Sequence, residues 1–299
     1  MAIWEFRLGF IIKTLKRFLA GQDTTCPHCR SHNTKLIDTK YIILQLMRCI
    51  DCGLMFRYPK DDVQTNIEFY QKSYCEGSVS ETPSDKALKE LIDSSFAETG
   101  VCCREHIQII KLFKQGGTLL DYGCSWGYRT WQFQRAGFES MGFEISKPRA
   151  SFGSKKLSVK IISSYADLNS VPNNSFNVIY TNHVLEHLPN LFCIFKEFYR
   201  LLRDDGIIII FVPNSTGYEN KEIRKSKMPA AFGEKHTLAF DDTFFEINLP
   251  KYGFEVRCFS SPYKILDNPF RIKKGKIEAS GPELMVIGRK KKISNIKVW

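Results

Sequence analysis

The sequence predicts an α/β protein in which a mostly parallel sheet has helices on both faces and a small β module precedes it. After residues 116–117, short apolar runs alternate with segments of helical periodicity. This alternation is typical of parallel sheets, because the connection between two parallel strands usually contains a helix. Two Cys-x-x-Cys pairs among β-like runs mark the small module at residues 24–58.

Apolar runs of strand length give the expected elements in chain order. The small module should contain strands at Thr34–Asp38 and Tyr41–Met47, and residues 60–113 should be mainly helical. The large sheet should contain Thr118–Asp121, Glu139–Glu144, Val159–Ser163, Asn177–Thr181, Gly206–Val212, Gly253–Ser260 and Glu283–Arg289. A polar insertion follows residue 214, and a helix is expected near Asp242–Leu249.

The N-terminal segment has helical periodicity. Trp4, Leu8, Ile11, Leu15 and Phe18 fall on one helical face, with basic residues interleaved. Three interpretations stay open: a helix docked on the protein or a partner subunit, an interfacial membrane helix, or a disordered segment. The expected organisation is an amphipathic basic helix at 1–20, a cysteine-bearing module at 21–60, a helical connector or cap at 61–114, and an α/β domain with a basic tail at 115–299.

The net charge of +11 is concentrated at the two ends of the chain. Residues 1–20 have a net charge of +3 and residues 271–299 a net charge of +7, so the rest is close to neutral. A nucleic-acid enzyme more often has a basic face beside its active site. The observed distribution instead indicates solubility, frayed tails, or weak attraction to a membrane or polyanion.

The sequence contains no secretory signal pattern and no apolar run long enough to span a bilayer. Ten cysteines without such a signal favour a reducing compartment over a disulfide framework. We therefore expect a cytoplasmic protein, with peripheral contact at the inner face of the membrane left open.

Four cysteines have the spacing of a metal site. Cys26 and Cys29 form one Cys-x-x-Cys pair, and Cys49 and Cys52 form a second after 19 residues. Two such turns can arrange four thiolates tetrahedrally around zinc, and a module this small needs the metal to hold its fold. Because the protein fills all four positions, the zinc should be structural. An iron–sulfur or redox role, or four ordinary buried cysteines at this spacing by chance, are the alternatives. His28 and His32 are expected on the surface.

A glycine-bearing turn follows the first strand of the large sheet. Gly123 permits a sharp turn after Asp121, and Gly127 lets the next helix approach a ligand. Glu144 follows the second strand, where a carboxylate can accept hydrogen bonds from both ribose hydroxyls of an adenosine-containing cofactor. Neither a nicotinamide-type G-x-G-x-x-G nor a Walker A loop is present.

With these motifs the sequence resembles the class I S-adenosylmethionine-dependent methyltransferases, in the bacterial branch marked by HVLEHL. The matching segments are LLDYGCSWG, GFEIS, NSFNVIYTNHVLEHLPN, LLRDDGIIIIFVPN and HTLAFDDTFFEINLPKYGFEV, within about residues 115–290. The pattern CPxC…RCxxCGLxFxxP resembles the zinc-ribbon front end of proteins in that branch, often met in surface-glycan or secondary-metabolite pathways. The resemblance implies a Rossmann-like sheet of seven strands with the last one antiparallel.

The resemblance also implies a set of cofactor-binding positions. They are Asp121, Gly123, Cys124 and Gly127 in the turn that holds the methionine part, Glu144 at the ribose, Ile145, Tyr165 and Ala166 around the adenine, and Asn182 and His183 near the sulfonium. Ser125 stands where the family usually has Gly, so the backbone is less free there.

Methyl transfer from a sulfonium is an in-line displacement, so the protein must orient the acceptor and take up its proton. His183 and His187 fall on one face of an expected helix, and histidine is suited to proton transfer near neutral pH. Their open alternatives are packing, hydrogen bonding at a helix start, or a metal pair lacking an obvious third ligand. Tyr74 and His236 are further candidates above the strand ends.

We therefore expect methyl transfer to oxygen or nitrogen of a small-molecule or glycan-type acceptor. Methylation of DNA bases is disfavoured, because Val212-Pro213-Asn214-Ser215 is not an amino-methylation motif and no Pro-Cys nucleophile follows the fourth strand. Two alternatives stay open: an RNA methyltransferase with the zinc module as RNA reader, and an inactive scaffold whose Ser125 and Trp126 block the cofactor. The sequence does not indicate an oligomeric state.

Overall fold

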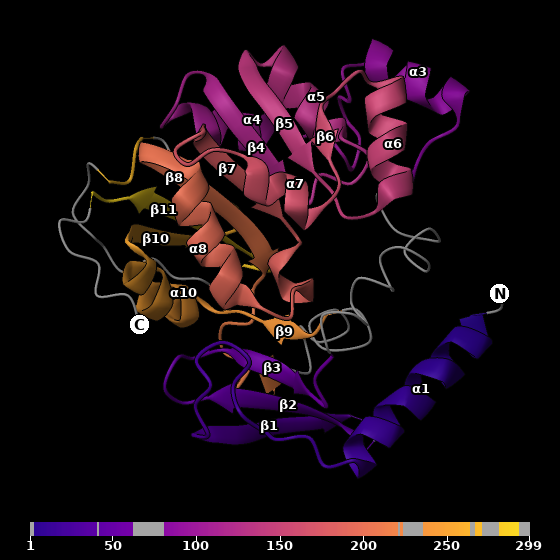
Figure 1. Ribbon diagram of the computed structural model, residues 1–299, viewed down its shortest axis with the longest axis vertical. Helices are drawn as coiled ribbons and strands as arrows, with labels where there is room; N and C mark the ends of the chain where they lie inside the picture. The colour runs from indigo at the N-terminus through magenta and orange to yellow at the C-terminus, as the bar shows by residue number, and fades with distance from the viewer. Residues whose placement is uncertain are drawn as a thin grey trace.

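The computed structural model of the protein describes residues 3–40, 42–61, 81–220, 222–223, 236–263, 267–270 and 281–292. A seven-stranded sheet with helices around it forms the larger part, and a four-stranded sheet lies beside it (Figure 1). Tyr74 and much of the basic tail lie outside the described residues.

The large sheet has the order β10-β11-β8-β7-β4-β5-β6. Its strands are β4 (Gly117–Tyr122), β5 (Phe138–Phe143), β6 (Ile161–Ile162), β7 (Phe176–Asn182), β8 (Leu202–Pro213), β10 (Phe254–Ser260) and β11 (Glu283–Lys290). Strand β11 pairs antiparallel with both β8 and β10, and it is the one strand of this sheet whose direction is opposite to that of the other six. The predicted fold, a mostly parallel Rossmann-like sheet with its last strand reversed, is confirmed. Strand β6 is shorter than expected, and β8 begins earlier.

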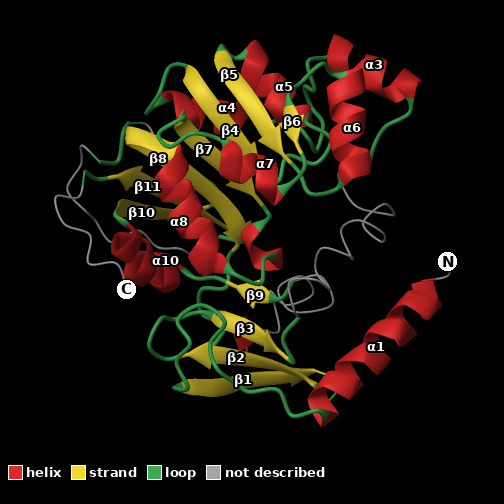
Figure 2. Cartoon of the chain, in the orientation of Figure 1, coloured by secondary structure: helices red, strands yellow, loops and turns green. Residues whose placement is uncertain are grey.

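Helices cover both faces of this sheet, as the layering in Figure 2 shows. They are α3 (Asp85–Asp93), α4 (Arg104–Lys111), α5 (Tyr128–Arg135), α6 (Lys147–Lys156), α7 (Tyr165–Ser170), α8 (Leu191–Leu201) and α10 (Asp242–Asn248), the last continued by the 3-10 helix η2 (Leu249–Tyr252). Side-chain hydrogen bonds cap the N-terminal ends of several of these helices. Asn190 accepts a hydrogen bond from the N–H of Cys193 and so begins α8.

The small sheet takes its fourth strand from the far end of the chain. It consists of β1 (Thr34–Lys40), β2 (Leu44–Cys49), β3 (Met55–Tyr58) and β9 (Leu238–Ala239), in that order. Met55 and Phe56 pair with Ala239 and Leu238. The next residue, Phe240, forms a parallel bridge with Asn214 just after β8. The cysteine-bearing module is therefore joined to the large sheet by backbone hydrogen bonds as well as by packing.

One hydrophobic core runs through both sheets. It includes Cys26 and Phe56 from the module together with Phe195 of α8 and Phe244 of α10. His28 is 7% exposed, and its ring lies 5.3 Å from that of Phe244. The prediction of a surface His28 was wrong, because the module packs this residue against α8 and α10. Burial lowers the pKa of His28 to about 4. His32 is exposed, as expected.

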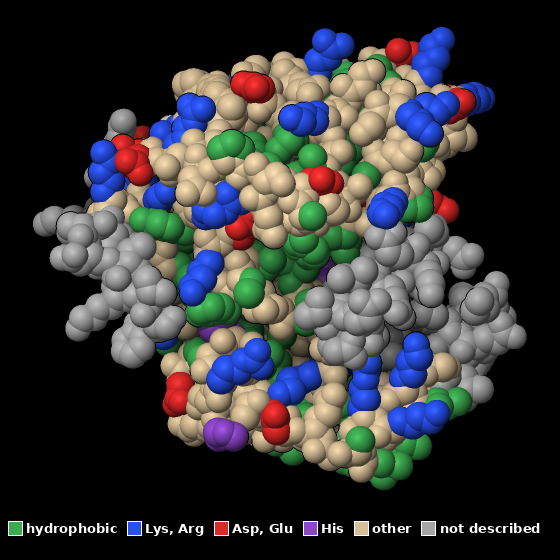
Figure 3. Space-filling view, viewed as in Figure 1, with side chains coloured by type: hydrophobic (Ala, Val, Ile, Leu, Met, Phe, Trp, Pro, Cys, Tyr) green, Lys and Arg blue, Asp and Glu red, His purple; other side chains and the backbone are tan. Residues whose placement is uncertain are grey.

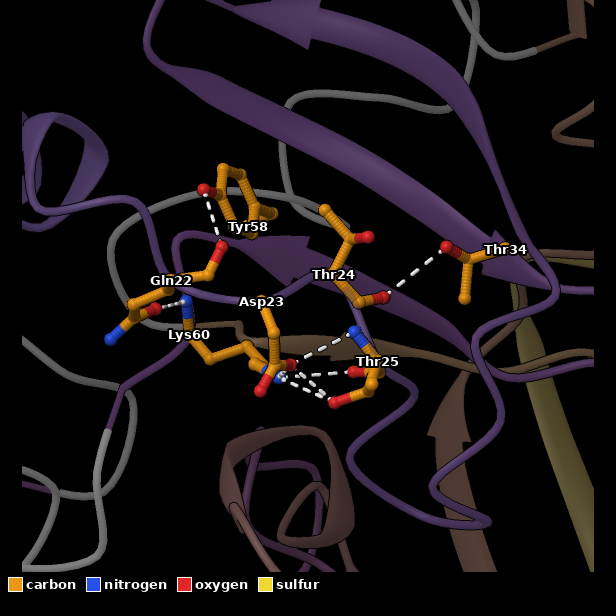
Figure 4. A network of polar contacts seen from close by, with 7 residues as sticks. All are labelled: Gln22, Asp23, Thr24, Thr25, Thr34, Tyr58 and Lys60. Carbon is orange, nitrogen blue, oxygen red and sulfur yellow. Dashed lines mark hydrogen bonds and ion pairs between the residues drawn. The ribbon is translucent and has the colours of Figure 1, made fainter.

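Hydrogen bonds and an ion pair connect the first residues of the module to its last residues (Figure 4). Lys60 donates to Asp23 Oδ1 at 2.8 Å and to the carbonyl of Thr25 at 3.0 Å, and Tyr58 donates to the carbonyl of Gln22 at 2.9 Å. The hydrogen bond from Lys60 holds the pKa of Asp23 well below its usual range. These contacts fix residues 22–25 beside residues 58–60.

Helix α1 (Ile3–Leu19) extends away from the two sheets (Figure 1). Arg17, near its C-terminal end, forms an ion pair with Asp61, and Phe18 packs edge-on against Tyr58. Ile12 and Leu19 are exposed, so part of its apolar surface is uncovered. Of the helices in the described part of the chain, none combines the length and apolarity needed to cross a bilayer.

Asp241 should be essential for docking the module. Its Oδ1 accepts from the N–H of Phe244 and caps α10, while Oδ2 lies 2.8 Å from Arg48 of β2. Asp241→Ala removes both contacts and should lower the free energy of unfolding by roughly 1–3 kcal/mol, measured by chemical denaturation. The matched control is Asp242→Ala, because within the described ranges the Asp242 carboxylate accepts a hydrogen bond from the N–H of its neighbour Thr243 and forms no ion pair. Equal losses in the two variants would contradict this assignment.

Candidate active site

A cavity of about 580 Å³ opens at the carboxyl ends of β4, β5 and β7. Parallel sheets generally place their ligand sites at this edge. In Figure 3 the surface is hollowed between the two sheets, and apolar side chains show inside the hollow. The lining residues are Gly100, Cys102, His106, Tyr122, Gly123, Ser125, Tyr128, Arg129, Phe143, Glu144, Ile145, Tyr165, Asn182, His183, Val184, His187, Leu188, His236 and Glu283.

The glycine-bearing turn forms one wall of this cavity. The N–H groups of Gly123 and Cys124 both donate to the carbonyl of Phe143, which ties the turn to the end of β5. Gly123 has a φ of 81°, and a Cβ there would lie 2.3 Å from Val184. A side chain at position 123 is therefore excluded by both conformation and space.

Ser125 adopts a left-handed conformation with a φ of 53°. Glycine adopts this conformation more readily than serine does, so the backbone of residue 125 depends on the contacts around it. Two contacts hold the serine in place: its N–H donates to Glu144 Oε2 at 3.0 Å, and Arg149 donates to its Oγ at 2.7 Å. The turn thus keeps its shape without the glycine.

Glu144 directly follows β5 and lies next to the glycine-bearing turn. It is 6% exposed and accepts from the N–H groups of Ser125 and Ser146, one on each carboxylate oxygen. Burial raises its pKa above the ordinary value. Each oxygen retains a lone pair for a further donor, and Ile145 and Tyr165 line the cavity beside it.

Four positions implied by the resemblance are absent from the lining of the cavity. Asp121 accepts from Thr130 at 2.8 Å below the turn, and Cys124 packs against Gly142. Gly127, with a φ of 78°, begins α5, and Ala166 is exposed on α7. Trp126, also absent from the lining, is 2% exposed in the cluster with Phe96 and Tyr128.

The opposite wall carries the two histidines of the HVLEHL motif. The expectation that they share one helical face was wrong. His183 has a φ of 53°, and only Leu185–His187 forms a helical turn, the 3-10 helix η1. Because the backbone of His183 is left-handed, a helix cannot include both His183 and His187. Both side chains nevertheless line the cavity.

His183 is clamped between two carboxylates. Its Nδ1 lies 3.2 Å from Glu186 Oε1, and its Nε2 lies 2.6 Å from Glu283 Oε1. Burial alone would lower the pKa of His183, but the two carboxylates outweigh it and raise the pKa to about 9. Tyr263 donates to the other oxygen of Glu283. His183 is therefore protonated at neutral pH and unsuited to accept a proton.

Sequence reasoning missed Glu283 as a site residue. It begins β11 and pairs with Pro213 at the end of β8. Because β11 is antiparallel, its first residue lies at the edge where the parallel strands end. The sequence signal was available in the predicted reversal of the last strand, which places the start of that strand at the cavity.

Arg129 and His106 were also missed. The Nε of Arg129 is buried without a hydrogen-bond partner, and among the described residues no carboxylate lies within ion-pair distance of its guanidinium. His106 lies 2.7 Å from the hydroxyl of Tyr180 and stacks on Phe211, and burial lowers its pKa to about 4. His236, a sequence candidate, does line the cavity, with its ring 4.8 Å from that of His187.

The four predicted zinc ligands form a cluster apart from the cavity. Their sulfur atoms all lie within 4.8 Å of one another, with Cys26–Cys52 and Cys29–Cys49 each separated by 3.5 Å. Tetrahedral zinc with bonds of about 2.3 Å would separate its sulfurs by ~3.8 Å, so the four residues fit this metal. Backbone N–H groups of His28 and Leu54 donate to the sulfurs.

Comparison with known proteins gives one family. A family model described as a methyltransferase domain matches residues 96–258, more than half of the chain. No curated protein matches. The chain is similar to solved structures of an S-adenosylmethionine-dependent methyltransferase from Archaeoglobus fulgidus (20% identity, 68% of this chain and 99% of that chain, TM-score 0.48) and of another from Thermotoga maritima (18% identity, 69% and 96%, TM-score 0.46).

Proposed function

The chain belongs to the methyltransferase domain family, and on that premise we propose that it methylates an oxygen or nitrogen atom of a small-molecule or glycan-type acceptor. S-adenosylmethionine is the methyl donor. The observation that carries this proposal is the division of the cavity into two walls. One is formed by the glycine-bearing turn and Glu144, the other by the histidines and carboxylates around His183.

The first wall fits the cofactor. Glu144 has lone pairs for the two ribose hydroxyls, and Ile145 and Tyr165 offer apolar surface beside it for the adenine. The turn at Gly123 and Ser125 would hold the methionine part. When bound, the cofactor supplies a methyl group already activated by the sulfonium charge. Trp126 lies outside the cavity lining, and Ser125 is held in the turn by Glu144 and Arg149, which argues against a scaffold in which these two residues block the cofactor.

The second wall fits the acceptor. His183 is occupied by Glu186 and Glu283, so of the two motif histidines His187 is better placed to act on the acceptor. His106 also lines the cavity, and burial keeps it neutral by lowering its pKa to about 4. The mixture of apolar surface and neutral or paired polar groups suits a hydroxyl- or amine-bearing substrate better than a polyanion.

The cysteine cluster is proposed as a structural zinc site. All four ligands come from the protein, which leaves no open position for catalysis. Zinc there would stabilise the module, whose strand β3 pairs with β9. The module packs against α8 and α10 and so supports the cavity from outside.

Glu144→Gln tests the cofactor site. The substitution weakens acceptance of the ribose hydroxyls, and S-adenosylhomocysteine should bind roughly 10- to 100-fold more weakly. In wild-type protein, ligand at 100 times its dissociation constant should add about 2.7 kcal/mol of stability, readily seen in thermal unfolding. Glu139→Gln, on an exposed position of β5, is the control. Absence of a shift in folded wild-type protein would refute the proposed function.

Arg129→Gln tests where the methionine carboxylate lies. Because Arg129 lacks an acidic partner in the described part of the chain, we assign it to that carboxylate. The variant should bind S-adenosylhomocysteine about 10- to 100-fold more weakly and leave the affinity for 5′-methylthioadenosine, which lacks the carboxylate, unchanged. Arg135→Gln on the same helix should affect neither ligand. Equal losses of affinity for S-adenosylhomocysteine and 5′-methylthioadenosine in Arg129→Gln would contradict the assignment.

Cys49→Ser tests the zinc site. The variant should lose about one equivalent of zinc, measured by elemental analysis of the purified protein, together with several kcal/mol of stability. Cys193→Ser is the matched control, because Cys193 is exposed at the start of α8. A Cys49→Ser protein that folds with unchanged stability in the absence of metal would exclude a structural role.

A further inference from the structure

A second group of side chains that could hold a metal ion lies at the cavity, separate from the cysteines. Glu186, His187 and His236 each offer a ligand atom, and these atoms all lie within 4.8 Å of one another. Two imidazoles and one carboxylate form a ligand set that binds divalent transition metals and leaves coordination positions open. The sequence had offered only a histidine pair without a third ligand.

Backbone contacts hold the two contributing segments together. The N–H and the hydroxyl of Thr237 both donate to the carbonyl of Glu186, at 3.0 and 3.2 Å. The carbonyl of Thr237 in turn accepts from the N–H of Arg57, at the edge of the small sheet. These bonds place His236 beside His187, with ring centres 4.8 Å apart. The juxtaposition is therefore built into the fold.

The Glu186 carboxylate provides independent evidence for a cation. Glu186 is 1% exposed, and neither of its carboxylate oxygens has a hydrogen-bond partner within the described ranges. Its closest cationic neighbour, His183, lies 3.2 Å from Oε1 and is shared with Glu283. His187 Nε2 lies 3.9 Å from the same oxygen, so the histidines offset part of the cost of burying this carboxylate, and its oxygens still have lone pairs that a metal ion could use.

We propose that Glu186, His187 and His236 bind a divalent transition-metal ion in the wall of the cavity. Three protein ligands leave at least one coordination position, and His187 and His236 both line the cavity, so that position faces the acceptor. The ion would orient a hydroxyl or amine of the substrate there. This orienting role rests on the proposed function, whereas binding of the ion does not.

Zinc is the appropriate probe, because nitrogen and oxygen ligand sets bind it more tightly than Mn²⁺ or Fe²⁺. Full-length wild-type protein and His236→Ala are dialysed against the same Zn²⁺ solution, and bound zinc is counted by elemental analysis. Wild type should retain one more equivalent than His236→Ala. His32→Ala, which removes an exposed histidine of the module, should match wild type.

Thermal shifts with S-adenosylhomocysteine, recorded on the same samples, separate this inference from the proposed function. A wild-type shift that persists in His236→Ala shows that the variant is folded and that its cofactor site is intact. A zinc difference of one equivalent supports the site even if no shift is seen. Equal zinc contents in wild type and His236→Ala would overturn the metal site whatever the cofactor result.

Discussion

The short segment of residues 236–241 connects every functional part of this molecule. Thr237 is hydrogen-bonded to Glu186 on one side and to Arg57 on the other. The next two residues form β9 in the small sheet, Phe240 bridges to Asn214, and Asp241 caps α10 while pairing with Arg48. This extended segment therefore fixes the positions of the cysteine module, the large sheet and the cavity wall relative to one another. His236 reaches the cavity because that stretch cannot shift independently.

The reversed strand β11 provides the second constraint. In a wholly parallel sheet the first residue of a strand lies at the edge opposite the ligand site. Reversal brings Glu283 to the cavity, where it shares His183 with Glu186. The resulting chain of Tyr263, Glu283, His183 and Glu186 fixes the left-handed residue 183 through side-chain contacts on both ring nitrogens. Charge pairing thus stabilises a backbone conformation that histidine seldom adopts.

Sequence reasoning named residues on both walls of the cavity, but it predicted the backbone geometry only of the wall that is made of local structure. Gly123 and Glu144 each directly follow a strand, so their positions depend only on a turn and on the order of neighbouring strands. The wall around His183 instead joins residues 106, 183, 184, 187, 236 and 283, which come from segments far apart in the chain. Periodicity placed His183 and His187 on an α-helix, because it contains no information about the carboxylates that hold His183. Likewise, composition could not show that α8 and α10 would bury His28.

The shared strand makes the small module inseparable from the larger part. A shortened chain beginning at residue 115 would retain Leu238 and Ala239 but lose β3, their partner in the small sheet. It would also uncover the apolar side chains of α8 and α10 that His28 and its neighbours cover. Unpaired strand edges beside exposed aromatic surface promote self-association. Such a fragment would be expected to aggregate, although it contains every strand of the large sheet.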